Sequence, residues 1–93
     1  MGDGTITTLE EAGYTLIAKT DTARTYRREE AGWKKFIHFQ RHEGKWYTFG
    51  TYSEYMEEEG GYFSRTLRMS VKEANAVAYT MRCLERDDKP VLD

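Results

Sequence analysis

Runs of alternating residues separated by short turns are the feature that most constrains how this chain can fold. Antiparallel strands can be joined by connections of two or three residues, whereas parallel neighbours need a crossover of a dozen or more. The spacing therefore predicts an antiparallel meander. The expected turns are Thr20–Thr22, Glu30–Gly32 and His42–Gly44. The expected strands are Tyr14–Lys19, Ala23–Arg28, Lys34–Arg41, Lys45–Tyr52 and, after an acidic loop over Ser53–Gly61, Tyr62–Met69.

A single long helical pattern follows the last predicted strand. Ser70 and Glu73 have the spacing of a capping box, in which a hydroxyl and a carboxylate satisfy free backbone N–H groups at a helix start. The expected apolar stripe of this helix is Val71, Ala74, Val77, Ala78, Met81 and Leu84, with Lys72, Glu73, Asn75, Arg82 and Arg86 facing elsewhere. Thr8 and Glu11 repeat the capping spacing, but Gly13 leaves room for only a short helical turn.

These elements predict the α+β class: an antiparallel β-meander of about five strands, with a C-terminal helix packed on one face and a short N-terminal helical turn. The chain has 93 residues, which is the size of one domain. We expect a flexible N-terminus over 1–7, a single domain over 8–86 and a C-terminal tail over 87–93. Leu, Ile and Val number eleven against thirteen aromatic residues, so the core should be built mainly from rings.

Cysteine usage and hydropathy indicate a cytoplasmic setting. Cys83 is the one cysteine and has no partner for an internal disulfide. The chain shows neither a signal-peptide pattern nor an apolar run of the roughly 18 residues that a membrane span needs. We therefore expect no membrane association. The position of Cys83 in the helix pattern predicts a buried or half-buried filler rather than a nucleophile.

Alternation along the strands separates the sheet into two predicted faces. The expected core face, under the helix, carries Tyr14, Leu16, Ala18, Tyr26, Ile37, Phe39, Tyr47, Phe49, Phe63, Leu67 and Met69. The other face is mostly Thr and polar, but large apolar side chains interrupt it, and one long helix cannot cover both faces. The residues that we expect to contact a partner protein there are Ile17, Arg27, Phe36, His38, Trp46, Thr48 and Arg68. The alternative is that the segment around Ile6 and Leu9 covers this face, or that the register differs by one residue.

No catalytic or metal-binding pattern is present in the sequence. His38 and His42 are four residues apart, which in a strand separates them by about 13 Å, too far for one ion. Neither a Gly-rich phosphate loop nor a nucleophile motif occurs. We therefore expect no metal, no cofactor and no enzymatic activity. A small enzyme with an unmarked site is the third hypothesis.

Nucleic-acid binding is the second hypothesis, because basic and aromatic residues interleave over residues 24–47. Seven basic residues face three acidic ones between positions 24 and 49, whereas residues 54–59 hold four glutamates. Cations can bind phosphates and rings can stack on unpaired bases. The expected nucleic-acid contacts are Arg24, Arg28, Lys34, Lys35, Arg41 and Lys45. Because the net charge of the chain is only −2, we expect a protein partner in preference to a nucleic acid.

Three features follow one another along the chain: the segment Leu9–Tyr14, strands of the Ile-x-Phe type such as Ile37 and Phe39, and a capped helix. In the order of these features the chain resembles small uncharacterised phage and prophage proteins of Gram-positive bacteria. The similarity covers roughly residues 8–86. It implies a mobile-element accessory protein that acts by binding, with a host system as one target. The leading hypothesis is thus a non-catalytic protein-interaction module whose partner is not identified, with a homodimer as the first candidate assembly.

Overall fold

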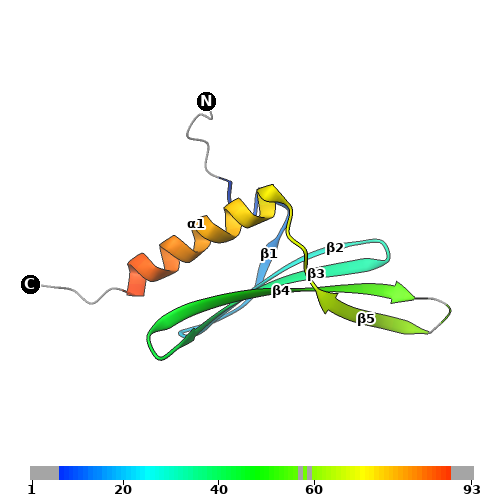
Figure 1. Cartoon of the computed structure of the whole chain (residues 1–93), viewed down its shortest axis with the longest axis horizontal. Coiled ribbons are helices and arrows are strands. Elements are labelled where there is room, and N and C mark those ends of the chain that lie inside the picture. Colours follow the sequence, from blue (N-terminus) through cyan, green and yellow to red (C-terminus); the bar gives the residue numbers. More distant parts are fainter. Residues whose placement is uncertain (1–6, 57, 59, 89–93) are drawn as a thin grey trace, which may run out of the picture.

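The computed structural model describes residues 7–56, 58 and 60–88. Five antiparallel strands form one sheet in the order β1-β2-β3-β4-β5, and a single long helix follows them (Figure 1). The predicted α+β meander is confirmed. The elements are β1 (Thr15–Thr20), β2 (Ala23–Glu30), β3 (Trp33–His42), β4 (Lys45–Met56), β5 (Gly61–Thr66) and α1 (Val71–Asp88).

The strands are longer in the middle of the sheet than the sequence predicts. β4 continues through Ser53 and Glu54, which we had placed in the acidic loop, because these residues pair with both β3 and β5. β5 is shorter than expected and ends at Thr66, although the Leu67 amide still donates to the Gly50 carbonyl at 3.0 Å. The expected flexible residues 1–6 lie outside the described residues, as do 89–93 of the expected tail.

The β3–β4 turn has two residues, not the three that we predicted, and this reverses the faces of β4. Glu43 and Gly44 both have positive φ, 52° and 79°, as a tight hairpin turn of the I′ type requires. His42 therefore pairs with Lys45, and Phe39 pairs with Thr48 rather than with Tyr47. Because side chains alternate with a period of two, the one-residue change moves every β4 side chain to the opposite face.

A bulge in β1 produces a second departure from the predicted faces. Leu16 pairs with Tyr26, but the register shifts so that Ala18 pairs with Thr25. Ala18 thus joins the face opposite the helix instead of the core, and Ile17 is the extra residue of the bulge.

The helix begins where the capping box predicts. The Glu73 amide donates to Ser70 Oγ at 3.1 Å, and the Ser70 amide donates to Glu73 Oε1 at 2.9 Å. The buried side of α1 matches the predicted stripe only in part, however. It presents Glu73, Ala76 and Val77 to the sheet, while Val71 is 79% exposed. Ala74 and Ala78 are also exposed, whereas Met81 and Leu84 of the predicted stripe pack against the core. The predicted orientation is therefore correct for Val77, Met81 and Leu84 and wrong for the first turns of the helix.

The N-terminal segment packs on the same side of the sheet as α1. Thr8 and Glu11 exchange hydrogen bonds as a capping box, and a single turn ends at Gly13, whose φ is 95°. Leu9 is fully buried in the core shared with the helix. The alternative in which this segment covers the other face is therefore wrong for the residues that are described. The core consists of Leu9, Ala12, Tyr14, Ile37, Phe39, Trp46, Leu67, Ala76 and Val77.

The molecule has two layers over only part of its length. α1 lies over one half of the sheet, and the far ends of β4 and β5 extend beyond it (Figure 1). Phe63, predicted to be in the core, is on the helix side of β5 but is 41% exposed for this reason. Within the described residues, no helix combines the length and the apolar character needed to cross a membrane.

Candidate functional site

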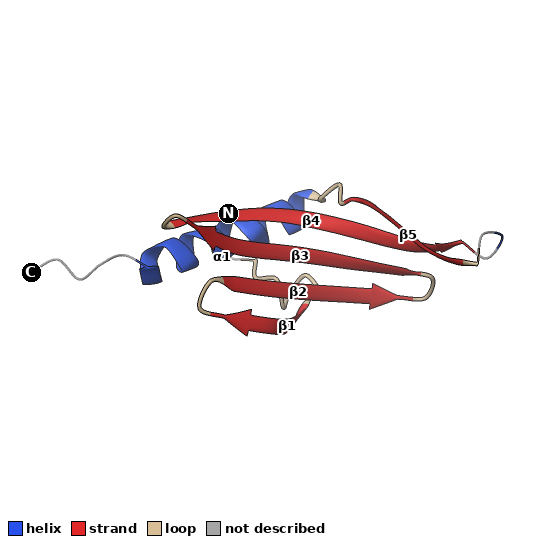
Figure 2. Ribbon diagram, turned by 90° about the horizontal axis from the view of Figure 1, so that it is seen from below, coloured by secondary structure: helices blue, strands red, loops and turns tan. Residues whose placement is uncertain are grey.

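The sheet face opposite α1, here called the open face, has no described element packed over it (Figure 2). Cross-strand partners share a face, so the register identifies its residues. One row runs from Arg27 through Phe36 and Thr51 to Thr66. The neighbouring rows pair Thr25, His38 and Phe49, and then Gln40 with Tyr47. The open face therefore carries rings on its central strands among hydroxyl and amide side chains.

Four of these rings form the aromatic cluster, which we define as Phe36, His38, Tyr47 and Phe49. The His38 ring is stacked between two others, with centroids 6.1 Å from Phe36 and 4.7 Å from Phe49. Tyr47 is two residues from Phe49 on the same face, and these two side chains are 53% and 46% exposed. Contiguous exposed rings of this kind are unusual on a monomer and are typical of contact surfaces.

His38 keeps the aromatic cluster uncharged at neutral pH. Its ring is half-buried, and this burial lowers the pKa of the imidazole below the ordinary value of 6.5. Nδ1 lies 3.2 Å from Thr25 Oγ1, which fixes the orientation of the ring. The cations of this face are at other positions, with Arg27 beside Phe36 and Lys34 and Lys45 toward the two ends of the hairpin.

The structure brings together three of the predicted contact residues and separates the others. Arg27, Phe36 and His38 are adjacent on the open face, as expected. Trp46 and Thr48 are on the helix side instead, because the two-residue turn reverses β4. Trp46 is only 6% exposed and belongs to the core, so its assignment to the open face was wrong.

The two remaining predicted contacts lie apart from the aromatic cluster. Ile17 is at the bulge of the edge strand β1 and is 45% exposed. Arg68 follows β5 in the connection to α1, where it lines a pocket with Lys35 on the helix side. Neither residue is part of the stacked rings.

Sequence reasoning missed Tyr47 and Phe49 as open-face residues, and also Tyr55 further along the same strand. Tyr55 is 46% exposed and pairs with β5 on this face. The signal that could have identified all three is Gly44, since Gly at the second position favours a two-residue turn of the I′ type, although Glu43 is not a preferred residue at the first position. That turn length alone determines which alternate residues of β4 face α1.

The predicted nucleic-acid contacts are divided between the two faces. Four of them lie on the helix side, namely Arg24, Arg28, Lys35 and Arg41. There Arg24 pairs with Phe39, Arg28 with Lys35, and Arg41 with Trp46 across the strands. Arg24 donates to backbone carbonyl groups and lies over the Trp46 ring at 5.6 Å. Lys34 and Lys45 are on the open face.

The helix-side cations further along β2 and β3 bind partners within the same chain. Arg28 donates to the Ala12 carbonyl and to Glu30, at 3.2 and 2.9 Å. Lys35 Nζ is 3.3 Å from a carboxylate oxygen of Glu73. The continuous basic-aromatic strip of the sequence is therefore not continuous on the surface.

Clusters of metal-ligating side chains are absent from the described residues, which contain no group of three His, Cys, Asp or Glu side chains placed to hold an ion. Cys83 is a half-buried thiol on α1. No family model, curated protein or solved structure matches this chain. The aromatic cluster is thus interpreted from its own geometry, and what it offers is apolar contact area.

Proposed function

We propose that this protein is a non-catalytic interaction module whose open face binds a second copy of the chain about a two-fold axis. The aromatic cluster carries the proposal, since uncharged, partly exposed rings are gathered on a face that no described element covers. A two-fold axis lets the same face serve both copies, and such symmetric dimers are the commonest oligomers.

The apolar area of the open face is close to what a dimer needs. An aromatic side chain offers roughly 200 Å², so the exposed fractions of Tyr47, Phe49 and Tyr55 leave about 300 Å² accessible. A standard interface buries about 800 Å² per partner, of which somewhat more than half is non-polar. The half-buried Phe36 and His38 and the threonine methyl groups of the open face contribute the rest.

Charge and ring geometry favour a protein over nucleic acid on this face. The aromatic cluster is uncharged, with its cations at the margins, which resembles the apolar centre and polar rim of a protein interface. Base stacking needs free ring faces. The near-parallel stacking of Phe36, His38 and Phe49 instead turns ring faces toward one another.

The substitution Phe49→Ser tests the proposal. Burial of the exposed part of each Phe49 ring involves about 90 Å², which at ~25 cal/mol per Å² contributes about 2 kcal/mol per ring. Loss of both rings of a dimer should weaken self-association about a thousandfold. Sedimentation velocity should then show a dimer for the wild type and a monomer for the variant.

Phe63→Ser is the matched control. Phe63 has nearly the same exposure, 41%, but lies on the helix side of the sheet. This variant should remain dimeric, and equal dissociation of both variants would contradict the assignment of the interface to the open face.

A wild type that stays monomeric at the highest soluble concentrations would refute the proposal that a second copy binds the open face. If a purified host protein then bound the monomer and Phe49→Ser abolished binding, the chain would be a mobile-element accessory protein acting on its host.

A further inference from the structure

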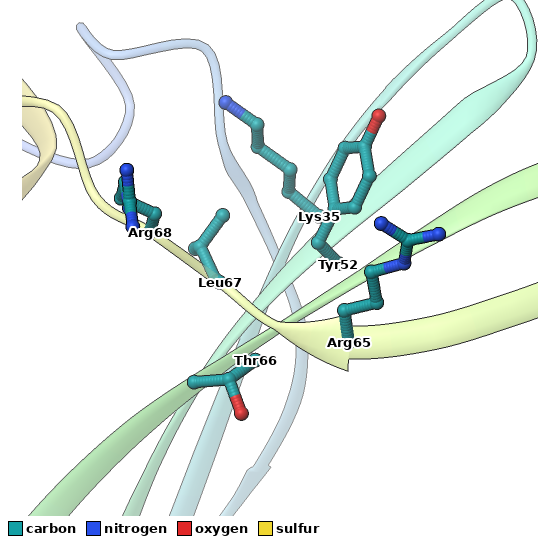
Figure 3. A pocket seen from close by; sticks show the side chains of 6 residues that line it. All are labelled: Lys35, Tyr52, Arg65, Thr66, Leu67 and Arg68. Carbon is teal, nitrogen blue, oxygen red and sulfur yellow. The ribbon is translucent and has the colours of Figure 1, made fainter.

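A pocket of about 280 Å³ opens on the helix side of the sheet, where the chain leaves β5 toward α1 (Figure 3). Its lining residues are Lys35, Tyr52, Arg65, Thr66, Leu67 and Arg68. Lys35, Tyr52 and Arg65 are successive cross-strand partners and therefore project from the same face. Figure 3 shows these three side chains with Leu67 and Arg68 on one side of the sheet and Thr66 pointing to the other.

Three of the six lining residues are cations, and none is acidic. Lys35 makes one ion pair, with Glu73 Oε2 at 3.3 Å, and an ammonium group has three N–H donors. Within the part of the chain that the structure describes, the side chains of Arg65 and Arg68 form neither an ion pair nor a hydrogen bond. The pocket therefore has two guanidinium groups whose positive charge is not neutralised locally.

We infer that this pocket binds a small molecule that carries a phosphate group. Guanidinium groups bind phosphate oxygens with paired hydrogen bonds, and an ammonium group adds a point charge. The volume of about 280 Å³ is just below the range for drug-sized ligand sites, about 300–1,000 Å³, which suits a compact monoester. Leu67 and the ring of Tyr52 provide apolar contacts for its organic part.

The surroundings of the pocket favour a small phosphate ester over the backbone of a nucleic acid. The ring of Trp33 lies next to that of Tyr52, with centroids 6.2 Å apart. Arg28 and Lys35 both lie over the Trp33 ring, at 5.7 and 5.1 Å. That ring is therefore not free to stack on a base, whereas Phe63, two residues from Arg65 on the same face, is 41% exposed. A single-stranded nucleic acid stacks successive bases on several rings, and one exposed ring beside the pocket is a poor platform for that.

This site is independent of the open face, because its three cations project from the opposite side of the sheet. Titration of the ¹⁵N-labelled full chain with glycerol 3-phosphate at low ionic strength tests it. We expect saturable shifts of the Arg65, Leu67 and Arg68 amides. Arg65→Gln and Arg68→Gln should each weaken binding about tenfold or more, because each removes charge-assisted hydrogen bonds.

Arg82→Gln is the control, since Arg82 is an exposed cation on α1 that does not line the pocket. Unchanged affinity in this variant supports the site, whereas equal weakening by Arg82→Gln would show a general charge effect and overturn it. Inorganic phosphate and a single-stranded oligonucleotide are the two comparison ligands. Tighter binding of the oligonucleotide than of the monoester, or no saturable shift with any of the three, would refute the inference.

Discussion

Replacement of Glu73 by alanine should lower the free energy of unfolding by about 3–5 kcal/mol, although this residue is in the first turn of a helix on a small sheet. Its side chain is 3% exposed and accepts three hydrogen bonds. The donors are the Tyr14 hydroxyl at 2.5 Å, the Ser70 amide at 2.9 Å and Lys35 Nζ at 3.3 Å. The carboxylate thus connects the N-terminal segment, β3 and α1.

The expected loss of stability follows from the hydrogen-bond donors that lose their acceptor in the alanine variant. Hydrogen bonds to a charged group contribute about 1.5–3 kcal/mol each, and a lost helix cap costs about 1 kcal/mol. The contributions are not additive, and the half-buried Lys35 can regain water, so the sum is reduced. Tyr14 is almost completely buried and would lose the acceptor of its hydroxyl. Tyr14→Phe should therefore cost about half as much as Glu73→Ala.

Urea denaturation followed by tryptophan fluorescence measures these changes. Glu85→Ala is the control, because Glu85 is exposed on the same helix, and it should change stability by less than about 0.5 kcal/mol. If Glu73→Ala were no more destabilising than Glu85→Ala, the buried carboxylate would not hold the three segments together and the reasoning would fail.

The pH dependence provides a second measurement on the same carboxylate. Burial raises the pKa of Glu73, but hydrogen bonds from Ser70 and Tyr14 and the charge of Lys35 outweigh it, and the pKa lies below the ordinary 4.5. The pKa of Tyr14 is raised by burial and by the hydrogen bond to Glu73, so its hydroxyl stays protonated. A lowered carboxyl pKa stabilises the folded state above pH 4.5, and this stability is lost as the pH falls through the folded value. Glu73→Gln should remove that part of the acid transition.

Three further predictions concern the helix cap, the core and the open face. Ser70→Ala should cost about 1 kcal/mol in urea denaturation, and an unchanged midpoint would exclude Ser70 as the cap. Trp46→Ala should cost about 3–5 kcal/mol, since this ring is in the core; a fully stable variant would contradict the two-residue turn. Self-association should weaken as the pH falls through the pKa of His38, which burial holds below the ordinary 6.5, because protonation of the ring would charge the interface. Sedimentation at pH 5.5 and 7.5 measures it, and no difference would place His38 outside the interface.

Short-range sequence patterns were sufficient to predict the strands, the helix and their order along the chain. The meander follows from short connections, and the start of α1 follows from Ser70 and Glu73, three residues apart. These features depend on atoms close together along the chain, so composition and spacing contain the necessary information. The same holds for the pairing of Tyr26 with Ile37, which we had placed on one face and which are cross-strand partners.

The faces of β4 could not be assigned from its own residues. Both sets of alternate positions contain rings, Trp46 and Tyr52 on one side and Tyr47 and Phe49 on the other. Only the length of the Glu43–Gly44 turn decides between them, and one residue reverses the result. The open face was therefore correctly expected to carry exposed rings, but half of those in the aromatic cluster were not the predicted ones.

Contacts between segments distant in the sequence decided how α1 packs on the sheet. The orientation of α1 depends on Glu73, whose partners Tyr14 and Lys35 are 59 and 38 residues away in the chain. A helix pattern ranks a glutamate as a solvent-facing residue, because desolvating a carboxylate is unfavourable without partners. Those partners exist only once β3 and the N-terminal segment have come together. The apolar stripe predicted the burial of Val77, Met81 and Leu84, whereas the burial of Glu73 was decided by the tertiary structure.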